Sequence, residues 1–394
     1  MPWKETYVLD LRKEFVHRAL TERTTFTDLC AEYGISTKTG YKWKERFLSH
    51  GYGGLEDHSR RPNSCPSQLN EDAVIRIMQL KLAHISWGPK KIQTLYENIY
   101  RKTPVPSISS IQRVLDKAGL VRKKRVRRAQ PNQSALRQRI EAVKPNDVWT
   151  VDFKGWWFTN LREKCIPLTI RDQNSRFLLD IRLMQTCTTN SVKQVFINSF
   201  EKYGLPRYIR SDNGSPFAAH NSILGLSSLS AWWLTLGIIP DRIEPGKPYQ
   251  NGGHERMHRD MKFELQGKIS GGLNAHQRAI DVWRDEFNNV RPHEALGMKT
   301  PAEVYNRSDI KYEGDSEELI YPFGYFSRKV SSNGNIKLNN SIIQISSALS
   351  GYHLGLNNRD DSSLNVWIND FLLGEIDLRT YSFNSISEEV LTSS

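Results

Sequence analysis

Val148-Trp149-Thr150-Val151-Asp152-Phe153 is the stretch of sequence that decides the fold. Its residues are largely β-branched or aromatic, which favours a strand, and we predict that strand over 147–156. Alternation then places the apolar side chains at positions 149, 151 and 153 on one face of a sheet, with Asp152 near the end of the strand. A carboxylate held among buried groups is costly unless something neutralises it, so Asp152 is a candidate functional residue.

On the C-terminal side of this run, the sequence predicts a mixed α/β core. Strands over 164–172 and 176–184 follow the first with short connections, which is typical of an antiparallel meander. The later predicted elements are, in order, a helix over 189–203, a strand over 207–210, a helix over 226–236, a strand over 238–243 and helices over 251–266 and 275–288. This is the element order of a ribonuclease H-like core, a mixed five-stranded sheet covered by helices.

Two further acids occupy informative places in this order. Asp212 follows the fourth strand in Tyr208-Ile209-Arg210-Ser211-Asp212-Asn213-Gly214, and Glu255 begins a late helix in Gln250-Asn251-Gly252-Gly253-His254-Glu255-Arg256. We expect Asp152, Asp212 and Glu255 to meet, because folds bring distant acids together at strand ends and helix starts. Three converging carboxylates can hold two divalent cations, and two cations can drive in-line displacement at phosphorus.

Other acids compete for these roles from less suitable positions. Asp172 falls at a predicted turn, Asp180 falls in mid-strand and Glu244 precedes a Pro-Gly loop. Glu264 shares much of the helix face of Glu255 but lies more than two turns beyond it. The simplest interpretation of any single acid is a solvated surface group, and this holds for most of the 43 Asp and Glu residues.

The chain as a whole is basic. Its 55 Lys and Arg residues outnumber 43 Asp and Glu residues, giving a formal net charge of +12. An excess that persists over 394 residues indicates a polyanionic partner, whose binding should weaken steeply with salt. At this length several domains are expected. We find no apolar run that could span a bilayer and no signal-peptide pattern, so a membrane partner is not expected.

The cysteines indicate a reducing compartment. They are few and lack the paired spacing of a zinc site or a disulfide framework: Cys30, Cys65, Cys165 and Cys187. We therefore expect a cytoplasmic protein.

Residues 1–55 contain a helix-turn-helix pattern. A helix over 7–20 is followed by a second helix, a turn at Gly34 and a third helix whose N-cap is Ser36. Four side chains would face outward from this last helix, where they could read a DNA major groove: Thr37, Lys38, Tyr41 and Lys42. The alternative is an ordinary helical hairpin with a solvated basic face.

The rest of the chain divides by composition. We expect a linker over 56–70, a second helix-turn-helix-like domain over 71–121 and a basic linker over 122–144. The α/β core would span 145–310, and a β-rich domain, interpreted as a small β-barrel with a hairpin at an Asn-Gly pair, would span 320–394. The basic linker carries a run that would track phosphates without reading sequence: Arg122, Lys123, Lys124, Arg125, Arg127 and Arg128.

Four sequence motifs follow one another along the chain. The three acids lie in the runs Val148–Phe153, Ser211–Phe217 and Pro248–Arg256, and a fourth run, Asn288–Leu296 with Thr300–Glu303, follows. Together they resemble the motifs of bacterial insertion-sequence transposases of the DDE type, whose catalytic core is shared with retroviral integrases. The resemblance extends to the N-terminal helix-turn-helix units and covers nearly the whole chain.

The resemblance implies a DNA transposase that binds the terminal inverted repeats of its insertion sequence and carries out metal-dependent cleavage and strand transfer. Asp152, Asp212 and Glu255 would bind two Mg²⁺ ions, with Mn²⁺ able to substitute, to activate a water for nicking and then a 3′-hydroxyl for strand transfer. The implied partners are double-stranded DNA, at transposon ends and target, and further copies of the chain, at least a dimer on DNA. The implied location is the bacterial cytoplasm, on the nucleoid when DNA is bound. The interval between Asp212 and Glu255 is longer than in retroviral integrases, and Leu224–Leu236 is expected to supply the excess.

Two basic residues follow the third acid on its own helix face. Arg259 and Lys262 lie one and two turns beyond Glu255. We predict that they hold the phosphates of the transposon end. The alternative is an i,i+4 ion pair between Glu255 and Arg259.

Two interpretations from other functional classes compete with the transposase. His254-Glu255-Arg256-Met257-His258 satisfies the His-Glu-x-x-His pattern of zinc metalloproteases, but that site needs a third ligand and an apolar helix, whereas this helix carries Arg256, Arg259 and Lys262. The second is a DNA-binding regulator that keeps the fold without the chemistry. Three intact acids favour the enzyme, because a regulator has no use for converging carboxylates.

Overall fold

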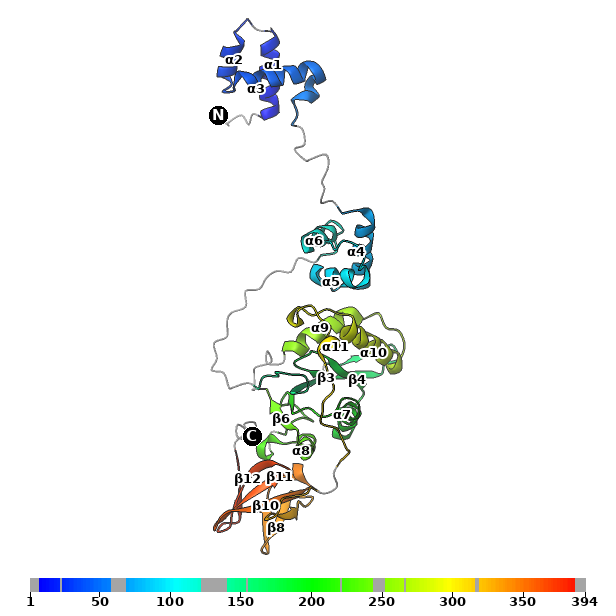
Figure 1. Cartoon of the computed structure of the whole chain (residues 1–394), viewed down its shortest axis with the longest axis vertical. Helices are drawn as coiled ribbons and strands as arrows, with labels where there is room; N and C mark the ends of the chain where they lie inside the picture. Colours follow the sequence, from blue (N-terminus) through cyan, green and yellow to red (C-terminus); the bar gives the residue numbers. More distant parts are fainter. Residues whose placement is uncertain are drawn as a thin grey trace. The chain divides into compact units, whose positions relative to one another are not determined.

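The computed structural model describes residues 7–21, 23–57, 69–121, 140–153, 155–219, 222–243, 252–265, 267–315 and 319–386 (Figure 1). The chain folds as two compact units, Met1–Gln68 and Leu69–Ser394. Within the described ranges, no helix is both long and apolar enough to cross a bilayer.

The first unit is built from helices: α1 (Val8–Thr21), α2 (Phe26–Glu32), α3 (Thr37–His50) and the 3-10 helix η1 (Gly51–Leu55). The hydroxyl of Ser36 caps α3 by accepting a bond from the backbone N–H of Thr39 at 3.2 Å. Gly34 forms the turn with φ +63°, a conformation that glycine adopts without steric cost. Leu29 and Trp43 are buried together in the core of the unit. The predicted helix-turn-helix is confirmed.

The second unit begins with three more helices: α4 (Glu71–Ala83), α5 (Pro89–Ile99) and α6 (Ile108–Lys117). Asn70 caps α4 and Ser107 caps α6, each through its side-chain oxygen. The inner faces of the helices meet in a buried cluster that includes Ile77, Ile92 and Ile111. These helices therefore form a small core of their own.

A mixed sheet follows, with strands β1 (Val148–Phe153), β2 (Trp157–Phe158), β3 (Lys164–Asp172), β4 (Leu178–Met184), β5 (Tyr208–Ser211) and β6 (Ile239–Arg242). β3 pairs antiparallel with β1 and with β4, as the predicted meander requires. β5 pairs parallel with both β1 and β6, while the short β2 pairs with the start of β3. The first strand is shorter than predicted because Gly155, which has no side chain to pack, lies between β1 and β2.

Helices cover both faces of this sheet (Figure 1). The apolar positions of β1 pack against α7 (Thr189–Tyr203) and α8 (Ser228–Thr235). The opposite face packs against α9 (Gly252–Leu265) and α10 (Leu273–Asn289), through apolar residues of β4. Because side chains alternate along a strand, Thr150 and Asp152 point to the α9 side. The core ends with the short helices η4 (Glu294–Leu296) and α11 (Pro301–Val304).

The C-terminal residues form an antiparallel sheet in the order β13-β12-β11-β10-β7 and a separate two-stranded sheet, β8-β9. The strands are β7 (Phe326–Lys329), β8 (Asn335–Leu338), β9 (Ser341–Gln344), β10 (His353–Asp360), β11 (Ser363–Ile368), β12 (Phe371–Asp377) and β13 (Ser382–Ser385). The β-rich prediction is confirmed, but the pairing among the described residues does not show a closed barrel. The hairpin predicted at Asn333-Gly334 is wrong: β8 and β9 are joined at Asn339 and Asn340, which take φ +47° and +65° as a two-residue turn requires.

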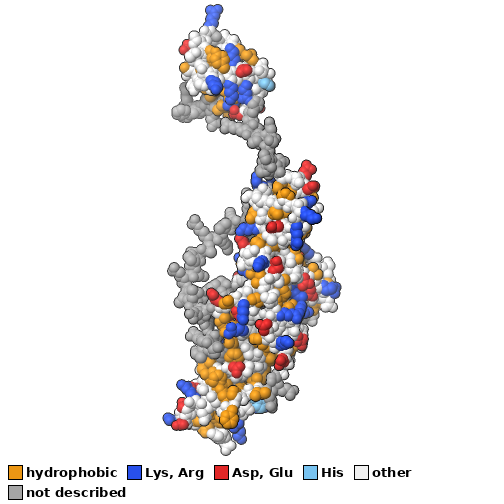
Figure 2. Space-filling view, in the orientation of Figure 1, with side chains coloured by type: hydrophobic (Ala, Val, Ile, Leu, Met, Phe, Trp, Pro, Cys, Tyr) orange, Lys and Arg blue, Asp and Glu red, His pale blue; other side chains and the backbone are white. Residues whose placement is uncertain are grey.

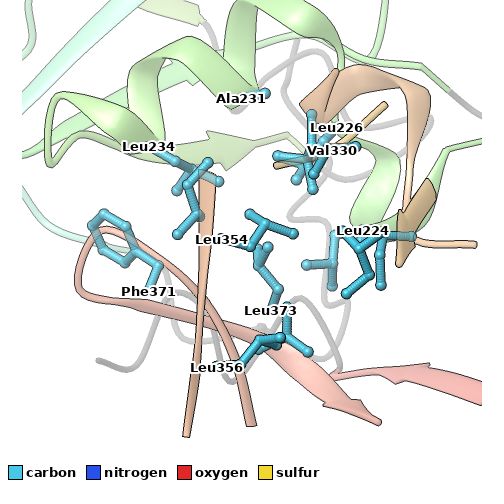
Figure 3. Close-up of a cluster of buried hydrophobic side chains, with 14 of the residues drawn as sticks. Leu224, Leu226, Ala231, Leu234, Val330, Leu354, Leu356, Phe371 and Leu373 are labelled. Carbon is cyan, nitrogen blue, oxygen red and sulfur yellow. The ribbon is translucent and has the colours of Figure 1, made fainter. Parts of the chain in front are cut away.

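One hydrophobic cluster joins this sheet to the core (Figure 3). Leu224 and Leu226, in and after the 3-10 helix η2 (Ile223–Gly225), lie with residues of α8 against Leu354 and Leu373 of the C-terminal strands. The cluster also includes residues around the 3-10 helix η5 (Ser347–Leu349). The C-terminal sheet therefore packs on a part of the core that lies between the second and third candidate acids in the sequence.

Candidate active site

Two of the candidate acids lie near the ends of neighbouring strands. β1 and β5 are parallel neighbours, and Thr150 is the β1 residue of the last pair, opposite Arg210. Asp152 and Asp212 each stand two residues beyond that pair, at matching positions on strands that are about 5 Å apart. Both are half-buried. An oxygen of the Asp212 carboxylate accepts a bond from the Gly214 N–H at 3.0 Å, which holds this acid in the turn after β5.

The third acid lies on the helix that covers this face of the sheet. Glu255 is exposed in the first turn of α9, and residues 244–251, directly before that helix, lie outside the described ranges. His258 lies one turn after Glu255, and its Nδ1 is 3.4 Å from Oδ2 of Asp152. Side chains three apart on a helix are neighbours, so Glu255 lies one turn from a side chain that contacts Asp152.

A buried arginine lies beneath the first turn of α9. A Cβ on Gly253 would stand only 2.0 Å from Nη1 of Arg171, so a larger residue here would displace the end of this buried side chain. Burial, followed by the charge of Arg176, lowers the pKa of Arg171 to about 10. The guanidinium therefore remains charged at neutral pH and places a positive charge below the helix that carries Glu255.

Two histidines on the inner face of α9 face the sheet. Burial, and then the charges of His258 and Arg171, hold the pKa of His254 well below its usual value, so this ring is neutral at neutral pH. Ring nitrogens of His254 and His258 and a carboxylate oxygen of Asp152 lie within 4.8 Å of one another, which is compatible with a metal site. However, the hydroxyls of Thr150 and Thr169 occupy both nitrogens of His254, at 2.6 and 3.0 Å. The His-Glu-x-x-His pattern therefore serves to pack α9 on the sheet.

The competing acids have structural partners. Asp172 is buried and accepts bonds from the backbone N–H of Asn146 and from Ser175, and burial raises the pKa of its carboxyl. Asp180 pairs with Arg284 at 2.9 Å. Glu264 pairs with a buried arginine of the fourth motif, at 2.5 Å. Glu244 lies outside the described residues.

The structure describes two of the three groups of predicted DNA-binding residues. Those on α3 are exposed on the first unit, where Lys and Arg side chains are visible at the surface (Figure 2): Thr37, Lys38, Tyr41 and Lys42. Arg259 and Lys262 are exposed on α9, and among the described residues no ion pair joins Arg259 to Glu255. The basic linker lies outside the described ranges: Arg122, Lys123, Lys124, Arg125, Arg127 and Arg128.

Sequence reasoning missed the polar residues behind the acids. Thr150, Thr169 and Arg171 stand at alternate positions of β1 and β3 and face α9, while His254 and His258 meet them from the helix. The available signal was polar side chains at every second position of otherwise apolar strands, combined with two histidines four residues apart. From the sequence alone, the two histidines suggest only a zinc motif.

Models of known families match four parts of this chain. Two models described as integrase core domain match residues 142–248 and 236–301. A helix-turn-helix domain matches residues 11–63, and a homeodomain-like domain matches residues 39–115. The chain therefore carries an integrase core domain behind N-terminal helix-turn-helix domains.

Curated relatives come from bacterial insertion elements. The chain is 28% identical over 243 residues to an uncharacterized 31.7 kDa protein of insertion element IS407 from Burkholderia multivorans, covering 60% of this chain and 82% of the relative. It is 28% identical over 254 residues to an uncharacterized 39.2 kDa protein of IS476 from Xanthomonas euvesicatoria, covering 64% and 69%.

Solved structures with some likeness include retroviral integrases. One is the HTLV-2 integrase catalytic core domain in complex with magnesium, with 16% identity, a TM-score of 0.31 and coverage of 42% of this chain and 100% of that one. Another is an intasome of simian T-cell lymphotropic virus in complex with a PP2A regulatory subunit, with 13% identity, a TM-score of 0.36 and coverage of 75% and 93%.

Proposed function

We propose that this protein is a DDE-type DNA transposase that cleaves the ends of its own insertion sequence and joins them to target DNA. The observation that supports the proposal is that Asp152 and Asp212 each lie two residues beyond the last residue pair of the parallel strands β1 and β5. α9, which bears Glu255, is held against Asp152 by His258. The integrase-core match and the insertion-element relatives support the same function.

The donor set suits magnesium. Mg²⁺ takes oxygen ligands, and two half-buried carboxylates from adjacent strands offer them, with Glu255 completing the set from the helix. When bound, two Mg²⁺ ions, or Mn²⁺, would supply the Lewis acidity that activates a water for nicking and a 3′-hydroxyl for strand transfer. The carboxylates of this chain then act as ligands, and no side chain needs to attack phosphorus.

The DNA would be held by separate parts of the chain. We propose that α3 reads the terminal inverted repeat through Lys38, Lys42 and their exposed neighbours. Arg259 and Lys262 would hold phosphates beside the acids, and the basic linker would add affinity without sequence preference. Paired ends require at least two copies of the chain on DNA. We also propose the domain boundaries predicted from the sequence. The protein would be cytoplasmic and would associate with the nucleoid when bound to DNA.

A cleavage assay tests the proposal. The substrate is the DNA that flanks the gene of this protein, incubated with Mg²⁺ or Mn²⁺ and wild type, Asp152→Asn, Glu255→Gln or the control Glu201→Gln, which removes an exposed acid at the end of α7. Site-specific nicking by wild type and the control, lost in the two site variants with DNA binding retained, is the expected result. DNA binding without cleavage by wild type would favour the alternative, a DNA-binding regulator that keeps the fold without the chemistry. Equal cleavage by Glu255→Gln would show that the third acid is misassigned.

The phosphate contact is tested separately. Lys262→Glu should abolish end cleavage without changing the thermal unfolding midpoint, because the side chain is exposed on α9. Lys268→Glu, which reverses an exposed charge beyond the end of α9, is the matched control. Unchanged cleavage by Lys262→Glu would contradict the proposed contact.

A further inference from the structure

A continuous line of polar contacts connects Thr150 of β1 to Asp152 of the same strand through two histidines of α9. His254 is 0% and His258 2% exposed, so their ring nitrogens need partners inside the protein. Nε2 of His254 lies 2.6 Å from the hydroxyl of Thr150, and its Nδ1 lies 3.0 Å from the hydroxyl of Thr169. The same Thr169 hydroxyl lies 3.0 Å from Nε2 of His258, whose Nδ1 lies 3.4 Å from Oδ2 of Asp152.

The donors and acceptors along this line determine its direction. An ionised carboxylate only accepts, so the nitrogen of His258 that faces Asp152 carries the hydrogen. The other ring nitrogen, Nε2, contacts the hydroxyl of Thr169, which accepts from it when the ring is charged and donates to it when the ring is neutral. The same hydroxyl accepts from Nδ1–H of the neutral His254, whose Nε2 accepts from the hydroxyl of Thr150. In either state of His258 its Nδ1–H faces Asp152.

A second arrangement is compatible with the same distances. The hydroxyls of Thr169 and Thr150 also lie 3.0 and 3.2 Å from the carbonyl oxygens of Asp152 and Arg171. If Thr169 donates to its carbonyl, Nε2–H of a charged His258 donates to Thr169 while Nδ1–H still faces the carboxylate of Asp152.

We propose that His258 is a positioning residue for Asp152, whose carboxylate it holds through Nδ1–H, with the hydroxyl of Thr169 holding the other side of its ring. The inference rests on the proposed function and deepens it. Groups that orient a metal-binding carboxylate raise metal affinity because the ligand is already turned towards its site. The same contacts set the position of α9 on β1 and β3, and so place Glu255 one turn away from the side chain that holds Asp152.

Three substitutions of His258 separate the proposed contact from packing. His258→Asn places an amide N–H close to the position of Nδ1 and keeps a donor for Asp152. His258→Gln places its amide near Nε2, so it keeps the Thr169 contact and loses Asp152. His258→Leu removes both. Thr169→Val and Thr169→Ser form a second matched pair, because only serine keeps the hydroxyl in the middle of the line.

The test measures Mn²⁺ affinity by isothermal titration on the full chain, alongside thermal unfolding and end cleavage at varied metal concentration. We expect His258→Gln and His258→Leu to weaken Mn²⁺ binding by about 10- to 100-fold, the range typical of groups that support metal ligands. His258→Asn and Thr169→Ser should bind Mn²⁺ nearly as wild type does, and Thr169→Val should weaken it in the same direction as His258→Gln.

Several outcomes would overturn the inference. If folded Asn and Gln variants lose affinity equally, the donor at Nδ1 is not what matters. If the Asn variant alone loses affinity, or if wild type takes up zinc at this site, His258 binds metal directly. If all variants bind as wild type does, His258 does not act on Asp152. Binding of Mn²⁺ without cleavage by wild type refutes the proposed function alone, whereas no Mn²⁺ binding by wild type refutes both.

Discussion

Arg291 should control the stability of the helix that carries Glu255. This arginine is 1% exposed, and its Nη2 contacts both carboxylate oxygens of Glu264 at 2.5 and 2.6 Å, while Nη1 lies 3.3 Å from Asp260. Both acids belong to α9. Arg291→Met leaves them without their buried partner, and breaking a buried ion pair costs about 3–5 kcal/mol. Because the side chains of Glu264 and Asp260 are 18% and 30% exposed, we expect the lower end, about 3 kcal/mol.

Hydrogen exchange measured by mass spectrometry reports this cost locally, which avoids assuming two-state unfolding for a chain with several domains. A loss of about 3 kcal/mol corresponds to roughly 100-fold faster exchange in peptides of α9. Peptides of α7, on the opposite face of the sheet, should be unaffected. Adding Glu264→Gln to Arg291→Met should restore part of the protection, because the double variant no longer buries that unpaired charge.

Two results would refute this reasoning. Unchanged exchange in α9 would show that the ion pairs contribute nothing to holding the helix. If the double variant instead loses the sum of the two single losses, Arg291 acts through packing, since its guanidinium also lies 5.4 Å from the ring centre of Trp283 and 5.3 Å from that of Phe287.

Three further predictions concern other parts of the chain. Burial lowers the pKa of His293 to about 3, so below pH 6.5 the unfolded chain binds a proton that the folded protein does not, and stability is lost as pH falls from 6.5 towards 3. The loss at pH 5 is about 2 kcal/mol, and His293→Phe should remove it in urea midpoints compared at pH 7 and pH 5. Lys38→Ala and Lys42→Ala should each reduce the slope of log affinity against log salt by about 1 in fluorescence anisotropy with end DNA. Leu354→Ala, at a side chain 0% exposed in the cluster shared with the core, should cost about 3 kcal/mol in thermal or urea unfolding, whereas Ile342→Ala, at a side chain 72% exposed, should cost close to nothing.

The type and order of the core elements could be predicted because local chemistry and packing agree there. In β1, strand-forming residues alternate between an apolar face that packs on α7 and α8 and a polar face that meets α9. The helix-turn-helix could also be predicted from the sequence, because Ser36 supplies the helix cap and Gly34 supplies the turn. The misplaced hairpin shows the limit of such signals, because two consecutive asparagines also supply the positive φ values of the turn, and the β8–β9 pairing selects them.

The contacts behind the acids could not be predicted, because they depend on how α9 sits on the sheet. Nothing in the spacing of Thr150 and Thr169 indicates that both hydroxyls meet the same histidine, which lies far away in the sequence. Gly253 also lies against the guanidinium of Arg171, a tertiary contact that local propensity does not indicate. For the same reason the docking of the C-terminal sheet on Leu224 and Leu226 was not foreseen.

The fourth sequence motif, Asn288–Leu296, supplies none of the candidate acids, yet the structure gives it a physical role at the site. Asn288 binds the backbone of Leu178 through both ends of its amide, at 2.9 Å each, and so anchors the end of α10 to β4. Three residues later, Arg291 holds the C-terminal half of α9 through Asp260 and Glu264. The N-terminal half is held by its histidines on β1 and β3. A helix held at both ends fixes the position of Glu255 relative to the sheet that carries Asp152. The fourth motif thus supports the helix on which the third acid of the proposed site lies.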